Sequence, residues 1–137
     1  MDRNLQLLGI AKKAGLLAVG SDDVSAAART GKAWLVVSAS DASAGALRRA
    51  GQNAGSAGVV HIVAPYTKFE IGNVSRRGSP GTVAVLDAGL AAGFLKGLAE
   101  ADPERYGNAA ELMAEAAAAD AERKKNTPSG KRRPAGL

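Results

Sequence analysis

The sequence is poor in the residues on which covalent and metal chemistry depends. Its 137 residues include no cysteine and one histidine, His61. Without cysteine there is no disulfide bond, no thiol nucleophile and no cysteine-bound zinc, and one histidine excludes a metal site built from several histidines. No apolar run approaches the roughly 18 residues that a membrane-spanning helix needs. We therefore expect a protein without metal or cofactor that does not enter a membrane.

Motifs of targeting and of catalysis are missing as well. The segment Met1–Asn4 lacks the basic-then-apolar pattern of a signal peptide, which predicts a cytoplasmic location. The chain has neither a phosphate-binding G-x-x-x-x-G-K-[ST] loop nor a G-x-S-x-G nucleophile elbow. His61 falls in the middle of a predicted strand, where we expect a packed or edge-exposed residue. We therefore expect that the protein is not an enzyme.

Basic charge is the first positive signal. The chain carries 18 basic and 13 acidic residues, for a net charge of +5, and such an excess favours a polyanionic partner. The charge is unevenly spread. Residues 1–100 have 11 basic and 7 acidic side chains. Residues 101–122 have one basic and six acidic side chains, and residues 123–137 have six basic and no acidic ones. An acidic segment thus separates a mildly basic body from a strongly basic end.

Strands alternate with helices along the first hundred residues, which predicts an α/β layer fold. The predicted strands are residues 16–19, 33–39, 59–63 and 82–86, and the predicted helices are residues 4–14, 22–30, 44–54, 68–74 and 88–101. The last three strands are nearly continuous apolar runs, as in strands that are covered on both faces. We expect one domain, residues 1–101.

Local signals mark the starts of three of these helices. Ser21 is the predicted N-cap of the second helix, with acidic residues following it at the positive end of the helix dipole. Thr67 and Glu70 have the spacing of a capping box, and Asp87 is the predicted cap of the last helix. The short helix that begins after Thr67 leads into a loop, residues 76–81, that is rich in arginine, glycine and proline.

The C-terminal part of the chain has a different composition. Residues 102–126 form an alanine-rich stretch, acidic and then basic, that favours a helix, with Asn108 as a candidate cap. Between Ala109 and Lys125 the few large apolar residues are Leu112 and Met113, so we expect this helix to pack weakly. Residues 127–137 are basic and rich in breakers, and we expect them to be disordered.

Four stretches, in this order and at these intervals, carry a resemblance to a known family. They are residues 7–16 (LLGIAKKAGL), 20–33 (GSDDVSAAARTGKA), 35–43 (LVVSASDAS) and 66–72 (YTKFEIG). The region that contains them, residues 5–98, resembles the ribosomal L-seven-Ae/L-thirty-e superfamily, and within it the bacterial ribosomal-protein-like branch.

The resemblance implies a three-layer α/β/α sandwich with a small mixed sheet, and binding to structured RNA without catalysis. Many members of the superfamily bind kink-turn RNA, and side chains at the start of their second helix read the edges of sheared G·A pairs. The implied partner is ribosomal or other structured non-coding RNA, with the ribosome as a further candidate. We expect the protein to be a monomer.

The resemblance also implies where the RNA would bind. A helix start offers free backbone N–H groups and a positive dipole end, and Gly20 allows a ligand to approach the backbone closely. Asp23 stands where family members have a glutamate that accepts hydrogen bonds from guanine, and Lys68 stands where many have a phosphate contact. The basic loop adds two arginines that could contact phosphate or stack on a base. The predicted RNA-binding residues are Lys12, Lys13, Gly20, Ser21, Asp22, Asp23, Lys32, Lys68, Arg76, Arg77 and Gly78.

Some of these positions have a second interpretation. Lys12, Lys13 and Lys32 lie near helix C-termini, where basic residues also stabilise the helix dipole. Trp34 is predicted to pack at the margin of the sheet, with base stacking as the alternative. Asp22 replaces the asparagine of kink-turn binders, and an ionised carboxylate cannot donate a hydrogen bond. The alternative function is therefore a protein-interaction module on the same fold that has lost RNA recognition.

Overall fold

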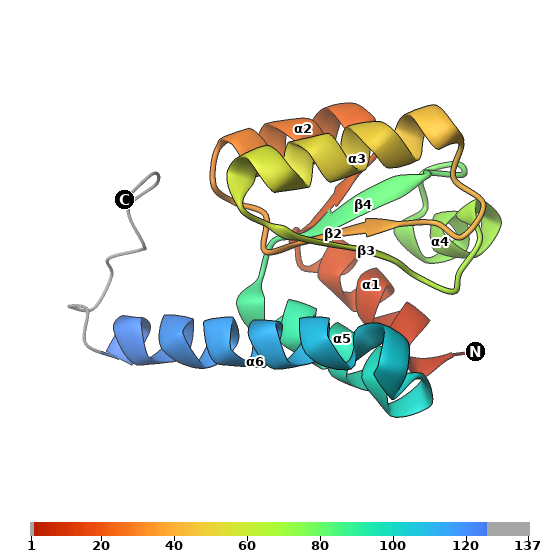
Figure 1. Cartoon of the computed structure of the whole chain (residues 1–137). Coiled ribbons are helices and arrows are strands. Elements are labelled where there is room, and N and C mark those ends of the chain that lie inside the picture. Colours follow the sequence, from red (N-terminus) through yellow and green to blue (C-terminus); the bar gives the residue numbers. More distant parts are fainter. Residues whose placement is uncertain (1, 126–137) are drawn as a thin grey trace.

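The computed structural model describes residues 2–125, and the tail predicted over residues 127–137 lies outside this part of the chain (Figure 1). The helices are α1 (Arg3–Lys13), α2 (Ser21–Arg29), α3 (Ala44–Ala57), α4 (Lys68–Ser75), α5 (Ala88–Ala101) and α6 (Pro103–Lys125). The strands are β1 (Leu17–Val19), β2 (Leu35–Ser38), β3 (Val60–Val63) and β4 (Thr82–Val85). The predicted α/β fold is confirmed.

The four strands form one mixed sheet in the order β1-β4-β2-β3. β4 runs antiparallel to both of its neighbours, β1 and β2, while β2 and β3 are parallel. Helices α2 and α3 cover one face, and α1, α5 and α6 lie on the other (Figure 1). The expected arrangement of a sheet between two helical layers is therefore what the chain adopts.

The core consists of two apolar clusters separated by the sheet. Leu35 and Val37 point into the larger cluster, which also contains Phe94 and Leu95 of α5. Val36, between them in β2, points into the smaller cluster with residues of α2 and α3. Side chains alternate between the two faces of a strand, so a strand covered on both faces must be apolar throughout. This explains the continuous apolar run of β2.

Strand β3 differs from the prediction of a buried strand. It lies at one edge of the sheet, and only Ile62 is fully buried, whereas its other three residues are half-buried. The preceding helix α3 is also longer than predicted. It continues through its internal glycines to Ala57 and ends at Gly58 in the left-handed conformation. Glycine weakens a helix but does not by itself end one.

The C-terminal helix starts earlier than predicted and is more firmly packed. Asn108 is not its cap, because α6 begins at Pro103 and its first turn is capped by Asp102, whose Oδ1 accepts from the Arg105 N–H at 3.2 Å. Proline suits the first position of a helix, so Pro103 both stops α5 and starts α6. Tyr106 and Met113 are buried in the larger cluster. α6 therefore shares the core of residues 1–101.

No helix within the described residues is both long and apolar enough to span a membrane.

His61 is a packed strand residue, as predicted. Its Nε2 lies 2.8 Å from the hydroxyl of Ser38, which is fully buried in the neighbouring strand. On the other side of the ring is Gly51 of α3, where an added Cβ would lie 3.7 Å from Nδ1. Burial lowers the pKa of His61 below its usual value of 6.5 because a charged imidazolium loses hydration there.

The lowered pKa of His61 should make the stability of the protein depend on pH. As the pH falls below about 6.5, the unfolded chain binds a proton before the folded chain does, so the free energy of unfolding decreases. The slope is at most about 1.4 kcal/mol per pH unit, the limit for one proton. Urea denaturation between pH 7.5 and pH 5 measures it. His61→Gln should flatten the curve in this range, and equal slopes in both proteins would contradict the assignment.

Candidate nucleic-acid interface

Most of the predicted site residues lie where the carboxyl ends of β1, β2 and β3 meet, which we call the carboxyl edge of the sheet. β1, β2 and β3 run in the same direction because β1 and β2 are both antiparallel to β4 and β3 is parallel to β2. Their carboxyl ends therefore meet at this edge, and α2, α3 and α4 all begin there. The loop before β4, residues 76–81, returns to the same place. In open α/β sheets ligands bind at such an edge.

The start of α2 is open. Its N-cap is Gly20 and not the predicted Ser21, which is already the first helical residue. Gly20 has φ +93°, a conformation that other residues rarely adopt, and its N–H donates to the carbonyl of Thr82 at 3.0 Å. No side chain among the described residues caps this helix.

The other helices in the described part of the chain are capped. The capping side chains are Asp2 for α1, Ser43 for α3, Thr67 for α4, Asp87 for α5 and Asp102 for α6. The predicted capping box of Thr67 and Glu70 is thereby confirmed, as is the Asp87 cap. At α2, the backbone N–H groups of the exposed first turn can instead donate to a bound group.

Arg77 lies beside this helix start. Together with residues 19–23 it lines a hollow of about 260 Å³. The hollow thus combines backbone N–H donors, a guanidinium group and the carboxylates of Asp22 and Asp23. Such a set can donate to phosphate oxygens and accept from the N–H groups of a nucleobase.

A second, basic hollow lies between α1 and α4. It has a volume of about 290 Å³ and is lined by Gln6, Gly9, Ile10, Lys12, Lys13, Asn73, Val74 and Arg76. Ile10 is 54% exposed there and adds an apolar surface. Arg76 lines this hollow and the next residue, Arg77, lines the hollow at the start of α2, so the arginine loop contributes one side chain to each. Gln6, Ile10 and Asn73 were not predicted, since no local pattern shows that α1 packs against α4.

The backbone of the arginine loop is tightly constrained. Arg76 has φ +59° and is the one non-glycine residue with positive φ in the described chain. An L-residue is strained there, and strain of this kind is concentrated at functional sites. The loop also lies directly on α4, where a Cβ at Gly72 would collide with the carbonyl oxygen of Gly78. Gly78 itself has φ +60°. Both glycines therefore position the two arginines.

Two predicted residues lie apart from these hollows. Lys68 is in the first turn of α4, at the end opposite Arg76, and its N–H donates to Asp41 Oδ1 at 2.8 Å. Lys32 follows the end of α2, at the end opposite the open start, and lines a separate hollow that also contains Trp34 and Asp120. Trp34 packs against the larger core cluster, as predicted.

No group of three or more potential metal-ligating side chains occurs among residues 2–125.

Comparison with known proteins identifies relatives by structure. No protein-family model matches the chain, and no curated protein matches it. A Bacillus halodurans protein of unknown function is 25% identical, with a TM-score of 0.64, over 71% of this chain and 97% of its own. A 15.5 kD RNA-binding protein of Giardia lamblia is 16% identical, with a TM-score of 0.52, over 61% of this chain and 70% of its own. The fold is therefore one that an RNA-binding protein also uses.

Proposed function

We propose that this chain is a non-catalytic RNA-binding protein of the L-seven-Ae/L-thirty-e superfamily and that it recognises a kink-turn in ribosomal or other structured RNA. The observation that carries the proposal is that the neighbouring residues Arg76 and Arg77 line one hollow each, and that the hollow of Arg77 lies at the uncapped start of α2. The likeness of fold to the Giardia RNA-binding protein supports it. The protein acts as a monomer.

The two hollows have different tasks in this proposal. At the start of α2, backbone N–H groups and Arg77 hold a phosphate, while Asp23 accepts hydrogen bonds from guanine N–H groups. In the groove between α1 and α4, Lys13 and Arg76 contact the phosphates of the adjoining strand, and Ile10 offers an apolar surface to an unstacked base. Phosphate contacts set the position of the RNA, and base contacts give the specificity.

Direct binding tests this proposal. The protein is titrated with a kink-turn RNA hairpin and with a duplex of the same length without the kink, each at 50 mM and 200 mM salt. We expect the kink-turn to bind at least about tenfold more tightly, with an affinity that falls steeply as salt increases. Equal binding to both RNAs would reduce the function to salt-dependent association with RNA. Absence of binding at low salt would overturn the proposal.

Asp22 provides an independent check of kink-turn recognition. Asp22→Asn replaces an acceptor that repels phosphate with a side chain that also donates hydrogen bonds. We expect the variant to bind the kink-turn several-fold more tightly than the natural protein and the duplex about equally. An unchanged affinity would assign Asp22 to another role.

The second candidate function is protein interaction, and α6 is the surface that favours it. Leu112 is 55% exposed on this helix between Glu111 and Glu115, which are exposed too. An apolar residue among acidic ones on a helix suits docking into a groove of a partner. This function would gain support if neither RNA bound.

A further inference from the structure

Beyond the first turn of α2, which carries the exposed Asp22 and Asp23, the helical layer of α2 and α3 is basic. Between Val24 and Phe69 the chain has five basic residues and one acidic residue, Asp41. The carboxylate of Asp41 accepts the N–H of Lys68 and so lies at the α4 end of this segment. The remaining surface of α2 and α3 beyond the first turn of α2 is basic.

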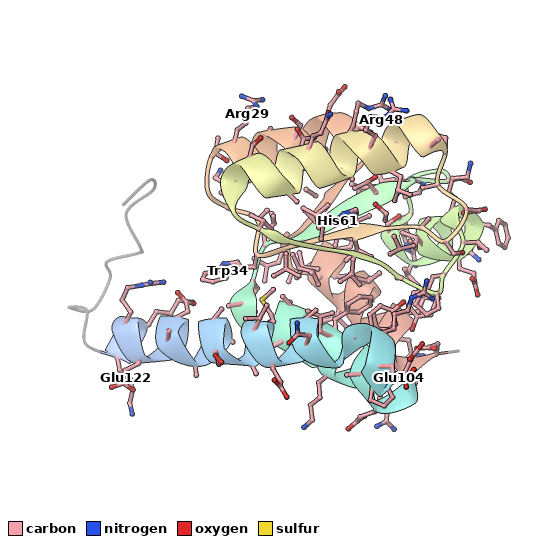
Figure 2. The ribbon with its side chains drawn as sticks, in the orientation of Figure 1. Arg29, Trp34, Arg48, His61, Glu104 and Glu122 are labelled. Atoms are coloured by element: carbon pink, nitrogen blue, oxygen red, sulfur yellow. The ribbon has the colours of Figure 1, made fainter. Side chains whose placement is uncertain are left out.

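These charges share one face of the molecule. Arg29 and Arg48 project outward from α2 and α3, away from the sheet, whereas Glu104 and Glu122 project from α6 on the opposite side (Figure 2). In α3 the buried residues are Ala50 and Ala54, so the arginines at positions 48 and 49 remain exposed. We call the exposed basic and uncharged polar residues of α3 and of the end of α2 the basic face; they are Arg29, the C-cap residue Thr30, Arg48, Arg49, Gln52 and Ser56.

The basic face begins near the candidate interface and leads away from it. α2 and α3 run parallel, because each follows one of two parallel strands, and both start at the edge that carries the hollow beside Arg77. Arg48 and Arg49 lie in the second turn of α3, close to that edge. At the far end, Arg29 and Thr30 line a shallow hollow of about 660 Å³ with Asn53 and Ser56. Arg48 and Ser56 are about 12 Å apart along the helix axis.

The composition of the basic face fits a nucleic acid better than a protein. Protein interfaces have an apolar core with aromatic residues, whereas nucleic-acid interfaces are polar and positively charged. The large apolar side chains that are exposed in residues 2–125 are Ile10, Phe69 and Leu112, and each lies outside α2 and α3. Arginine with Thr, Asn and Ser donors is the set that contacts phosphate and 2′-hydroxyl groups.

We infer that the basic face binds the sugar-phosphate backbone of a double-helical RNA stem that adjoins the element recognised at the start of α2. The inference rests on the proposed function and extends it, because it makes the substrate a structured element with an attached stem. It also assigns an RNA-binding role to Arg48 and Arg49, which were not among the residues predicted from the sequence.

Two RNAs that differ in stem length test the inference. Both carry the same kink-turn, and the stem next to its G·A pairs has either four or fourteen base pairs. The natural protein should bind the long-stem RNA about tenfold more tightly. The variant Arg29→Ala, Arg48→Ala, Arg49→Ala should lose this advantage but keep the affinity for the short-stem RNA. Its salt slope on the long-stem RNA should decrease by up to about three, one for each phosphate that an arginine no longer neutralises.

A matched variant controls for net charge. Arg3→Ala, Lys96→Ala, Arg105→Ala removes the same charge from exposed positions outside α2 and α3 and should leave both affinities nearly unchanged. If both variants lost the same affinity for the long-stem RNA, the inference would be overturned, since net charge alone would then explain the binding. Sedimentation of the free proteins adds a further outcome. Self-association that the basic-face variant abolishes, without any loss of RNA affinity, would assign the face to a second copy and overturn it.

Failure of the inference can be told from failure of the proposed function. If the natural protein binds both RNAs equally and the basic-face variant behaves like it, the inference is overturned and kink-turn recognition stands. If the long-stem RNA binds through the basic face but the short-stem RNA does not bind, the basic face is supported and recognition at the start of α2 is overturned. If neither RNA binds, both are overturned.

Discussion

A protein with Arg76→Glu and Arg77→Glu is expected to bind kink-turn RNA about a hundredfold more weakly than the natural protein. Each arginine loses a charge-assisted hydrogen bond, worth about 1.5–3 kcal/mol, and two such losses amount to a hundredfold or more in affinity. Each glutamate in addition repels phosphate. The salt slope should fall by about two. Fluorescence anisotropy with labelled RNA at several salt concentrations measures both quantities.

The fold should survive this double change. Arg76 already holds a strained positive φ, and glutamate is strained there to a similar degree, so the free energy of unfolding should remain within about 0.5 kcal/mol. Arg3→Glu with Lys96→Glu changes the net charge equally at exposed positions distant in sequence from the loop and is the control. If the control lost as much RNA affinity as the loop variant, Arg76 and Arg77 would have no special role.

Lysine at the same two positions separates charge from geometry. Arg76→Lys with Arg77→Lys preserves the charge, but lysine has neither the forked donors nor the flat surface that stacks on a base. Recovery of nearly full affinity would indicate simple phosphate contacts. A persistent loss of tenfold or more would indicate bidentate or stacking contacts.

The largest loss of stability is expected from Gly72→Ala. Gly72 is buried in α4, and a Cβ on it would collide with the Gly78 carbonyl oxygen and lie 2.9 Å from the Gly78 carbonyl carbon. Both are backbone atoms, which cannot rotate aside as a side chain can. The free energy of unfolding should decrease by about 3 kcal/mol, as for overpacking elsewhere, measured by urea denaturation. RNA affinity should decrease too, because the arginine loop has to move.

Gly55→Ala is the matched control. Gly55 lies in α3, and an added Cβ there would meet nothing within 4 Å. Alanine is the better helix former, so this change should raise stability by roughly 0.5–1 kcal/mol. A loss below about 0.5 kcal/mol for Gly72→Ala would contradict the tight contact between α4 and the loop, because surface substitutions without such a feature cause changes of that size.

The elements of the fold were largely predictable because their signals are local. The apolar run of β2, the capping box at Thr67 and the Asp87 cap each depend on residues a few positions apart. The two wrong caps have local reasons as well. Gly20, with its positive φ, is the N-cap of α2 in place of Ser21, so this helix begins one residue earlier than predicted. The Asp102–Pro103 pair starts α6 well before Asn108.

The packing of α6 was not predictable from its own composition. The helix has few large apolar residues, but Tyr106 and Met113 occupy the larger core cluster, and the Tyr106 hydroxyl donates to the Val63 carbonyl at 2.6 Å. Small alanine side chains let the helix approach α5 closely, so a moderate number of large residues suffices. The size of a buried face depends on the partner surface, and the segment alone contains no information about it.

The sequence by itself determined the residue types available for binding: an arginine-rich loop, a glycine followed by a polar helix start, and a basic excess before residue 100. Only the tertiary structure decided how they are grouped. It placed Arg77 beside the start of α2 and Arg76 beside α1. It left Lys68 in the first turn of α4 and Lys32 beyond the end of α2, where they line neither hollow. The physical reason is that strand order and helix direction bring together residues far apart in the chain, whereas sequence patterns report only on neighbours.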